Sequence, residues 1–298
     1  MMRRFLLPAV LVVCVTGCST LSPGRIHAGR SAFDGITYAH LERSDPRPLQ
    51  IHVLRIDLGR RHLTPVVDMA PDPDGGEPAE TSLVPPMVHA GRENVIAAVN
   101  GNAWGMVPPP AKGQSPRYVA GGACDVCGWV LADGLQRSRP QAGYWSLWGD
   151  RSGRVRIGNV TEPAPDAVWA IAGFAGLLHA GQVLPPPSDV RHPRTAAGTD
   201  RDGNLLILAV VDGRQPAYSE GMSERELAEL MLELGCYDAL NLDGGGSSVM
   251  LLRDADGELR IVNRPSDKSG PRPIPVLFGV RPASKSNADE SRGGRGTP

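Results

Sequence analysis

The most specific chemical signal in this chain is residues 243–248, which read Asp-Gly-Gly-Gly-Ser-Ser. Three consecutive glycines cost backbone entropy, so they suit a place where the main chain turns sharply or approaches a ligand closely. A tight turn between two strands would need only two of them. Exposed amides in such a turn can bind an oxyanion or a phosphate, and the two hydroxyls add donors. We therefore predict substrate-binding roles for Gly244, Gly245, Gly246, Ser247 and Ser248.

Two better-known glycine-rich motifs do not fit this segment. A phosphate-binding P-loop needs a lysine directly before the Ser or Thr, and Gly246 stands there instead. A nucleophile elbow needs glycine two places after the serine, and neither Ser247 nor Ser248 has one. The sequence therefore disfavours a nucleotide triphosphatase and a serine hydrolase.

Three apolar runs end in a polar residue beside glycine. Asn100 follows residues 95–99, Asp212 follows residues 205–211, and Asp243 follows the run that ends at residue 242. In sheets with parallel elements, ligands gather outside the carboxyl ends of the strands. We therefore expect these three strand ends to lie together and to surround the site.

A helix is predicted between Asp212 and Asp243. Ser223 and Glu226 form an S-x-x-E capping box, and Gly235 stands where a C-terminal cap belongs. The strand-helix-strand order allows a right-handed crossover between parallel strands. One face of the helix carries the apolar residues Leu227, Leu230, Met231 and Leu234.

The fold class follows from these patterns. Residues 205–211 form a continuous apolar run, typical of a strand buried on both faces. Residues 49–58 alternate, which predicts a strand with His52 facing solvent. We expect one α/β (α+β mixed) domain with a mixed sheet, few helices and long proline-rich loops around residues 71–86, 107–116 and 185–187.

The termini predict export and a lipid anchor. Residues 1–18 read as a lipoprotein signal peptide, with a positive start, an apolar stretch and a lipobox ending at Cys18, the lipidation site. Residues 19–32 are predicted to be a tether, residues 33–281 the folded domain, and residues 282–298 a disordered tail. We expect a cell-envelope protein, anchored by lipid at the periplasmic face of the outer membrane, or a secreted one.

The cysteines and acidic residues give no clear metal site. Cys124 and Cys127 lack the two further ligands of a zinc site, so a local disulfide is favoured in an oxidising compartment. Cys236 is predicted to be a buried, inert thiol. Asp212, Asp243 and Asn241 could offer oxygen ligands to calcium or magnesium, but no known loop spacing is present. We therefore predict no cofactor and no metal.

The charge distribution argues against nucleic-acid binding. The net charge is -1, with 31 basic and 32 acidic residues spread along the chain, and no basic stripe is visible.

Taken in order, these motifs resemble the phosphodiester glycosidase family. The resemblance covers residues 95–281 and is carried by residues 99–101, 194–198, 211–214, 219–222, 239–248, 262–266 and 272–273. The family's Asn-Gly motif is usually followed closely by aromatic residues, whereas here Asn102 and Ala103 come before Trp104.

The resemblance implies hydrolysis of a sugar-1-phosphodiester, such as a GlcNAc-1-phosphodiester, at the anomeric C–O bond. The expected substrates are envelope or exopolysaccharide glycans. Glycoside cleavage commonly uses two carboxylates. Because a phosphodiester is already a fair leaving group, stabilising its growing negative charge matters more than a strong general acid.

On this basis we assign roles to individual residues. Asp243 and Asp212 are the predicted catalytic carboxylates, with Glu220 in reserve. Arg194 and Arg214 would clamp phosphate oxygens. Asn100, Asn241, Ser247 and Ser248 would bind the sugar or the phosphate. An alternative for Arg194 is a plain ion pair with Asp212 that holds the strands together.

A second functional class remains open. The same pocket could serve a non-catalytic lipoprotein that binds envelope polysaccharide, because a fold does not fix a function. Two acids near a phosphate favour the enzyme, since a pure binder has less need of them.

Overall fold

The structure is a computed structural model that describes residues 25–29, 33–73, 75–76, 79–185 and 188–283. The predicted signal peptide with Cys18 and nearly all of the predicted tail lie outside these residues. None of the described helices has the length and apolar character needed to cross a membrane.

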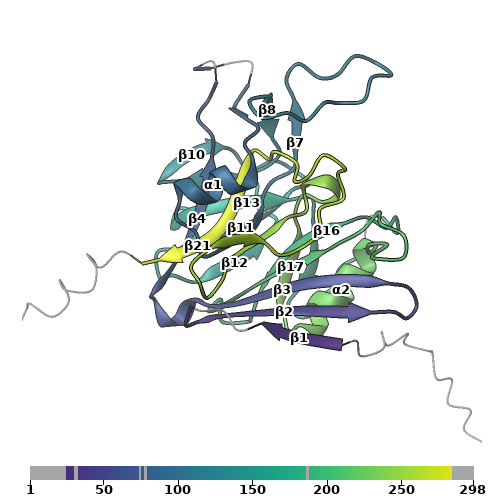
Figure 1. Ribbon diagram of the computed structural model, residues 1–298. Coiled ribbons are helices and arrows are strands. Elements are labelled where there is room, and N and C mark those ends of the chain that lie inside the picture. Colours follow the sequence, from purple (N-terminus) through teal and green to yellow (C-terminus); the bar gives the residue numbers. More distant parts are fainter. Residues whose placement is uncertain (1–24, 30–32, 74, 77–78, 186–187, 284–298) are drawn as a thin grey trace, which may run out of the picture.

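An eight-stranded sheet forms the lower layer in Figure 1. Its order is β1-β2-β3-β17-β16-β18-β14-β15, and every neighbouring pair is antiparallel. The strands are β1 (Arg25–Gly29), β2 (Ile36–Arg43), β3 (Leu49–Asp57), β14 (Ala175–His179), β15 (Gln182–Val183), β16 (Arg194–Thr199), β17 (Leu205–Val211) and β18 (Asp238–Asn241).

Two five-stranded sheets and a small three-stranded sheet complete the β structure. The first has the order β10-β9-β13-β11-β12, the second β20-β19-β6-β21-β4, and the third β5-β8-β7. Their strands are β4 (Leu63–Met69), β5 (Thr81–Ser82), β6 (Ala97–Asn100), β7 (Trp104–Met106), β8 (Ala123–Val126), β9 (Val130–Ala132), β10 (Leu135–Ser138), β11 (Trp145–Asp150), β12 (Val155–Gly158), β13 (Ala167–Gly173), β19 (Met250–Arg253), β20 (Leu259–Ile261) and β21 (Val276–Pro282).

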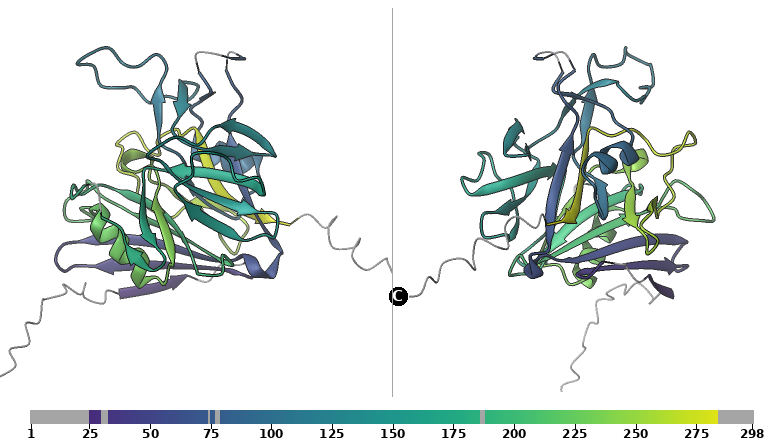
Figure 2. Two further views of the ribbon diagram at one scale, coloured as in Figure 1. Left: turned by 180° about the vertical axis from the view of Figure 1, so that it is seen from behind. Right: turned by 60° about the vertical axis from the view of Figure 1, so that its left-hand side comes forward.

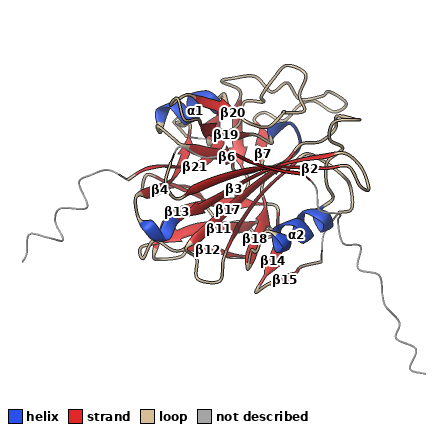
Figure 3. Cartoon of the chain, turned by 60° about the horizontal axis from the view of Figure 1, so that its bottom comes forward, coloured by secondary structure: helices blue, strands red, loops and turns tan. Residues whose placement is uncertain are grey.

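The described residues include two α-helices, α1 (Pro86–Arg92) and α2 (Glu224–Glu233), and two short 3-10 helices, η1 (Leu58–Arg60) and η2 (Gly245–Ser247). Figure 3 shows how far strands outnumber helices. The few helices agree with the expectation, but the predicted α/β (α+β mixed) class is corrected to a mainly β fold, because 43% of the described residues lie in strands.

The expectation of a mixed sheet is also wrong. Short hairpins and loops join most strands, so neighbouring strands in the described sheets run antiparallel. The predicted β17-α2-β18 unit exists, and β17 and β18 do run in the same direction. However, β16 lies between them and is antiparallel to both.

Strand β17 is buried on both faces, as its apolar run predicts. Leu206, Leu208 and Val210 face the main core, which all three large sheets share. Ile207, Ala209 and Val211 face a second core under α2. The second face is covered by a helix, so burial on both faces did not require a parallel sheet.

Helix α2 begins and ends where the sequence predicts. Ser223 accepts from the Glu226 amide and Glu226 accepts from the Ser223 amide, which completes the capping box. Gly235 follows the helix with φ +87°, a left-handed conformation that glycine adopts easily. Cys236, just after it, is buried, and burial raises the pKa of its thiol to about 12, consistent with an inert thiol.

Three smaller expectations need correction. His52 is 2% exposed, because strand alternation places it on the face of β3 that carries Leu54 and Ile56 toward the main core. Cys124 and Cys127 are free thiols, since side chains three apart in an extended segment point to opposite faces. The sheet begins with β1, inside the segment predicted as a tether, because backbone pairing with β2 extends its edge.

Candidate active site

The segment after β18 is an irregular loop that contains η2 (Figure 1). A side chain at Gly244 would place its Cβ 2.8 Å from the Pro193 carbonyl oxygen, to which the Gly245 amide donates at 2.9 Å. The loop therefore packs closely on the residue before β16. Glycine is required here for close approach as well as for turning.

Each of the next two glycines lies against an arginine. Gly245 has φ +62°, and an added Cβ would lie 3.1 Å from Nη1 of Arg214. At Gly246 an added Cβ would overlap the guanidinium of Arg272 and the carboxylate of Asp267. The three glycines thus let two guanidinium groups reach the backbone of one loop. Planar guanidinium groups and exposed amides are well suited to bind a phosphate.

Asp243 is the carboxyl group at this loop, and it is half-buried. Burial raises its pKa from 3.8 to about 6. The Ser247 hydroxyl, the Gly244 amide, the charge of Arg272 and the indole of Trp104 oppose that rise. A carboxyl group with such a pKa can exchange its proton near neutral pH, as acid–base catalysis requires.

The two serine hydroxyls are buried in the loop. Ser247 and Ser248 are each 1% exposed, and neither Oγ has a hydrogen bond of ordinary geometry within the described chain. Buried hydroxyls are usually satisfied. These two therefore fit the predicted role as donors to a ligand, with Ser247 lying beside Asp243.

Asn100 supports the loop from β6. Its Nδ2 donates to the Asp243 carbonyl at 2.7 Å, and its Oδ1 accepts from Thr195 Oγ1 at 2.8 Å and from the Val249 amide at 3.2 Å. Both ends of the amide are engaged by the protein. The geometry therefore supports a positioning role for Asn100 in place of the predicted contact with substrate.

Asp212 is buried at the end of β17, and protein groups surround its carboxylate. It accepts from Asn263 Nδ2 at 2.9 Å and from the Arg264 amide at 2.9 Å. The Tyr218 hydroxyl lies at 3.3 Å and His52 Nε2 at 3.5 Å. A carboxylate so enclosed is poorly placed to act on a substrate.

Asp212 instead connects to the glycine loop through Asn263. The same Asn263 Nδ2 also donates to the Ser248 carbonyl at 3.2 Å, and its Oδ1 accepts from the Met250 amide at 2.8 Å. The three predicted strand ends thus meet: Asn100 and Asp212 support the backbone on either side of the loop that begins at Asp243.

Arg194 does not reach the loop with its side chain. It is 6% exposed, pairs with Glu224 at 3.2 Å, and donates to the carbonyls of Met222 and Val190. Strand alternation turns it toward α2, so the predicted phosphate clamp at Arg194 is not supported. The alternative ion pair with Asp212 is also wrong, because Glu224 is its partner.

Two other predicted residues have side-chain partners outside the glycine loop. Glu220 faces Arg191 at 3.6 Å near the surface. Asn241 donates to Glu224 at 3.3 Å beneath α2. Among the described residues, no group of three His, Cys, Asp or Glu side chains is arranged to hold a metal ion.

Sequence reasoning gave no role to several residues that contact the site. Arg272 lies against Gly246, Trp104 reaches Asp243, and His192 lies 3.2 Å from Arg214. Arg272 was visible in one of the family motifs, and Trp104 as the aromatic residue that follows the Asn-Gly motif later than usual. Their contacts with Asp243 depend on loops far apart in sequence, which no local pattern reveals.

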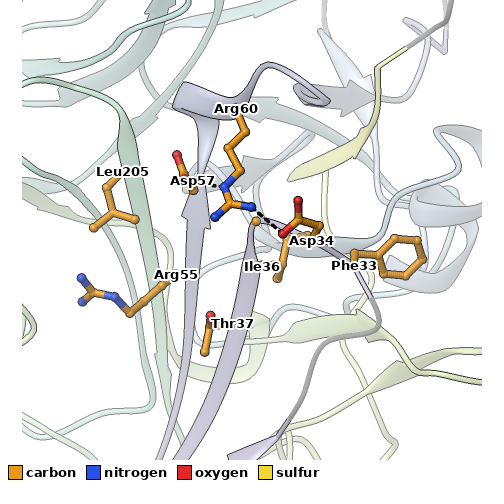
Figure 4. A pocket seen from close by; sticks show the side chains of 9 residues that line it. Phe33, Asp34, Ile36, Thr37, Arg55, Asp57, Arg60 and Leu205 are labelled. Atoms are coloured by element: carbon orange, nitrogen blue, oxygen red, sulfur yellow. Dashed lines mark hydrogen bonds and ion pairs between the residues drawn. The ribbon is translucent and has the colours of Figure 1, made fainter.

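An open pocket lies at the opposite end of the large sheet (Figure 4). It encloses about 420 Å³ and is lined by residues that include Asp34, Arg60 and Leu205. Leu205 begins β17 and Asp212 follows its end, a separation of about 20 Å along a strand of this length. Of its two arginines, Arg60 pairs with Asp34 and Asp57, and Arg55 donates to the Leu234 carbonyl.

Comparison with known proteins relates the chain to one family. The model of the family described as phosphodiester glycosidase matches residues 93–281. An uncharacterized SPbeta prophage-derived protein of Bacillus subtilis is 47% identical over 60 residues, covering 20% of this chain and 9% of that protein. The N-acetylglucosamine-1-phosphodiester alpha-N-acetylglucosaminidase of Bos taurus is 44% identical over 59 residues, covering 20% and 11%. The chain thus spans about a tenth of the length of these relatives.

Solved structures share the fold over most of the chain. The zebrafish N-acetylglucosamine-1-phosphodiester alpha-N-acetylglucosaminidase catalytic domain, described as auto-inhibited by its pro-peptide, superposes with a TM-score of 0.60 at 21% identity, covering 88% of this chain and 89% of that one. A hypothetical protein from Synechocystis gives a TM-score of 0.55 at 14% identity, covering 88% and 64%. At these identities the likeness establishes the fold alone.

Proposed function

Because the chain belongs to the phosphodiester glycosidase family, we propose that it hydrolyses a sugar-1-phosphodiester at the anomeric C–O bond. The sugar is released, and a phosphomonoester remains on the other group. One observation carries the proposal: a half-buried carboxyl group with a raised pKa stands at the start of a triple-glycine loop that two arginines contact.

The phosphate end of the substrate fits the glycine loop. Arg214 and Arg272 approach it from two sides, and Ser247 and Ser248 offer buried hydroxyls. Negative charge grows on the leaving phosphate as the C–O bond breaks, and fixed donors stabilise such charge strongly in a partly buried site. Arg214 keeps its predicted role, while Arg272 takes the place predicted for Arg194.

Asp243 acts on the sugar in its ionised form, as base for the attacking water or as nucleophile. Because the phosphate leaves without a strong acid, the reaction needs no second carboxyl group as general acid. Asp212 instead positions the loop through Asn263. The anomeric configuration of the first product separates the two roles of Asp243, since retention indicates a nucleophile and inversion a base.

The first test is release of sugar from GlcNAc-1-phosphodiesters by the purified protein in ¹⁸O-labelled water. Label in the released sugar supports the proposal. Label in the phosphate would show P–O cleavage and contradict it. Absence of release from a panel of sugar-1-phosphodiesters, with a folded protein, would favour the polysaccharide-binding alternative.

We also propose that the protein is an envelope lipoprotein that acts on envelope or exopolysaccharide glycans. Cys18 supports this through its lipobox, and it lies outside the described residues. Cells grown with labelled palmitate should label the wild type but not a Cys18→Ser variant. Equal labelling of the two would refute the anchor.

A further inference from the structure

The loop between β7 and β8 reaches the site through one aromatic ring. Residues 107–122 extend from the top of the molecule in every view of Figures 1 and 2. Within this loop, Tyr118 packs back onto the body. The Arg272 guanidinium lies over its ring, with Cζ 4.2 Å from the ring centroid, and Trp104 meets it edge-on with centroids 5.0 Å apart.

Both neighbours of Tyr118 also act on Asp243. Arg272 lies against Gly246 and lowers the Asp243 pKa through its charge, and the Trp104 indole lowers it by donating a hydrogen bond. Arg272 and Trp104 lie far apart in the sequence, and the Tyr118 ring contacts both. Cation–π and edge-to-face contacts of this kind stabilise particular side-chain orientations.

We propose that Tyr118 is a positioning residue, which holds Arg272 and Trp104 against the start of the glycine loop and so couples the 107–122 loop to the Asp243 carboxyl group. The significance of Tyr118 for catalysis rests on the proposed function, whereas its contacts with Arg272 and Trp104 are independent of that function.

The other groups around Asp243 determine how much of its environment depends on Tyr118. Ser247 and the Gly244 amide belong to the loop itself and do not depend on Tyr118. Arg214 approaches at Gly245 from the β17–α2 connection. Asp267 pairs with Arg272 at 2.8 Å and would retain it in part after Tyr118 is lost. The expected effect is therefore a partial release of Arg272 and Trp104.

The direct test measures the Asp243 pKa in the substrate-free, full-length protein by NMR titration of ¹³C-labelled aspartate carboxyl groups. Tyr118→Leu removes the ring, so the pKa should rise, by about one unit or a tenfold change in proton affinity. Tyr118→Phe keeps the ring and should leave the pKa unchanged. Tyr118→Met serves if the leucine variant fails to fold.

A matched control is Tyr237→Leu. The Tyr237 ring also lies under an arginine, with Arg201 Cζ 4.5 Å from its centroid, but it precedes β18 at the end away from the glycine loop. This variant should leave the Asp243 pKa unchanged. An Asp243 pKa in Tyr118→Leu equal to that of the wild type would overturn the proposal.

Kinetics provide a second readout once a substrate is known. Tyr118→Leu should raise KM about tenfold, because Arg272 is held less firmly. It should also shift the pH dependence of kcat upward, whereas Tyr118→Phe should do neither. If no phosphodiester is hydrolysed, the proposed function fails while the NMR comparison still decides the role of Tyr118.

Discussion

At the scale of single residues, Asp243 combines opposing influences. Burial raises its pKa, while Arg272, Trp104, Ser247 and the Gly244 amide lower it. The net result is a pKa of about 6, so the group ionises just below neutral pH while remaining in a site that disfavours charge. An ionised group held in this way is reactive at a cost in stability.

Replacing the charge should therefore stabilise the protein. The unfolded pKa of Asp243 is 3.8 and the folded value about 6. Its contribution to folding is most favourable below pH 3.8 and is lost as pH rises through about 6. Above that pH, Asp243→Asn should raise the free energy of unfolding by at most about 3 kcal/mol. Urea unfolding at pH 7 and at pH 3.5 checks this; a gain that is equal at both pH values would contradict it.

The same ionisation should govern the rate. If Asp243 acts in its ionised form, kcat should rise with pH, about tenfold per unit below pH 6, and level off above it. Steady-state rates between pH 4 and 9 measure this. A rate that falls as pH rises through 6 would show that the protonated form is the active one.

At the scale of elements, the sequence predicted helices and strands better than it predicted the contacts of individual side chains. The capping box of α2 and the buried run of β17 were readable because local spacing determines both. The roles of Arg194 and Asp212 were not, because strand alternation and neighbouring loops decide which way each side chain points. Arg194 turns toward α2, and Asp212 is enclosed by a loop fifty residues further along the chain.

Gly246, the third glycine of the loop, should be as necessary for substrate binding as Gly244 and Gly245. Gly246→Ala places a Cβ where the Arg272 and Asp267 side chains now lie, so the ion pair must move. We expect KM to rise at least about tenfold, since a displaced guanidinium loses its contact with the phosphate.

Gly91→Ala is the matched control for that change. Gly91 lies in α1 with open space around it, so alanine should leave KM unchanged and stabilise the helix by about 0.5–1 kcal/mol. An unchanged KM in Gly246→Ala would show that Arg272 does not bind substrate.

At the scale of the whole molecule, three large sheets share one core and place the site at one end of it. Asn100, Asp212 and Asp243 were predicted to meet, and they do, although the sheet is antiparallel. The convergence was predictable because each apolar strand ends in a polar residue. The antiparallel topology was not, since β16 enters between β17 and β18 from an earlier part of the chain.

Asn102 should be one of the residues that fix the sheets relative to each other. Its side chain is 2% exposed, donates to the carbonyls of Cys127 and Trp129, and accepts from the Ala172 amide. Asn102→Ala leaves these backbone groups unsatisfied and should cost about 2–4 kcal/mol of unfolding free energy. Asn204, which is exposed, provides the control, since Asn204→Ala should change stability by less than about 0.5 kcal/mol. Equal unfolding midpoints for the two variants would refute the role of Asn102.

Catalysis by Asp243 is measured by comparing GlcNAc release by the wild type, Asp243→Asn and Asp238→Asn. Asp238 lies at the other end of β18 and serves as the matched control. We predict a loss of kcat of about 10²–10⁴-fold in Asp243→Asn, with the fold retained, and wild-type turnover in Asp238→Asn. Near-normal turnover in Asp243→Asn would show that Asp243 is not catalytic and that the catalytic centre lies away from the glycine loop.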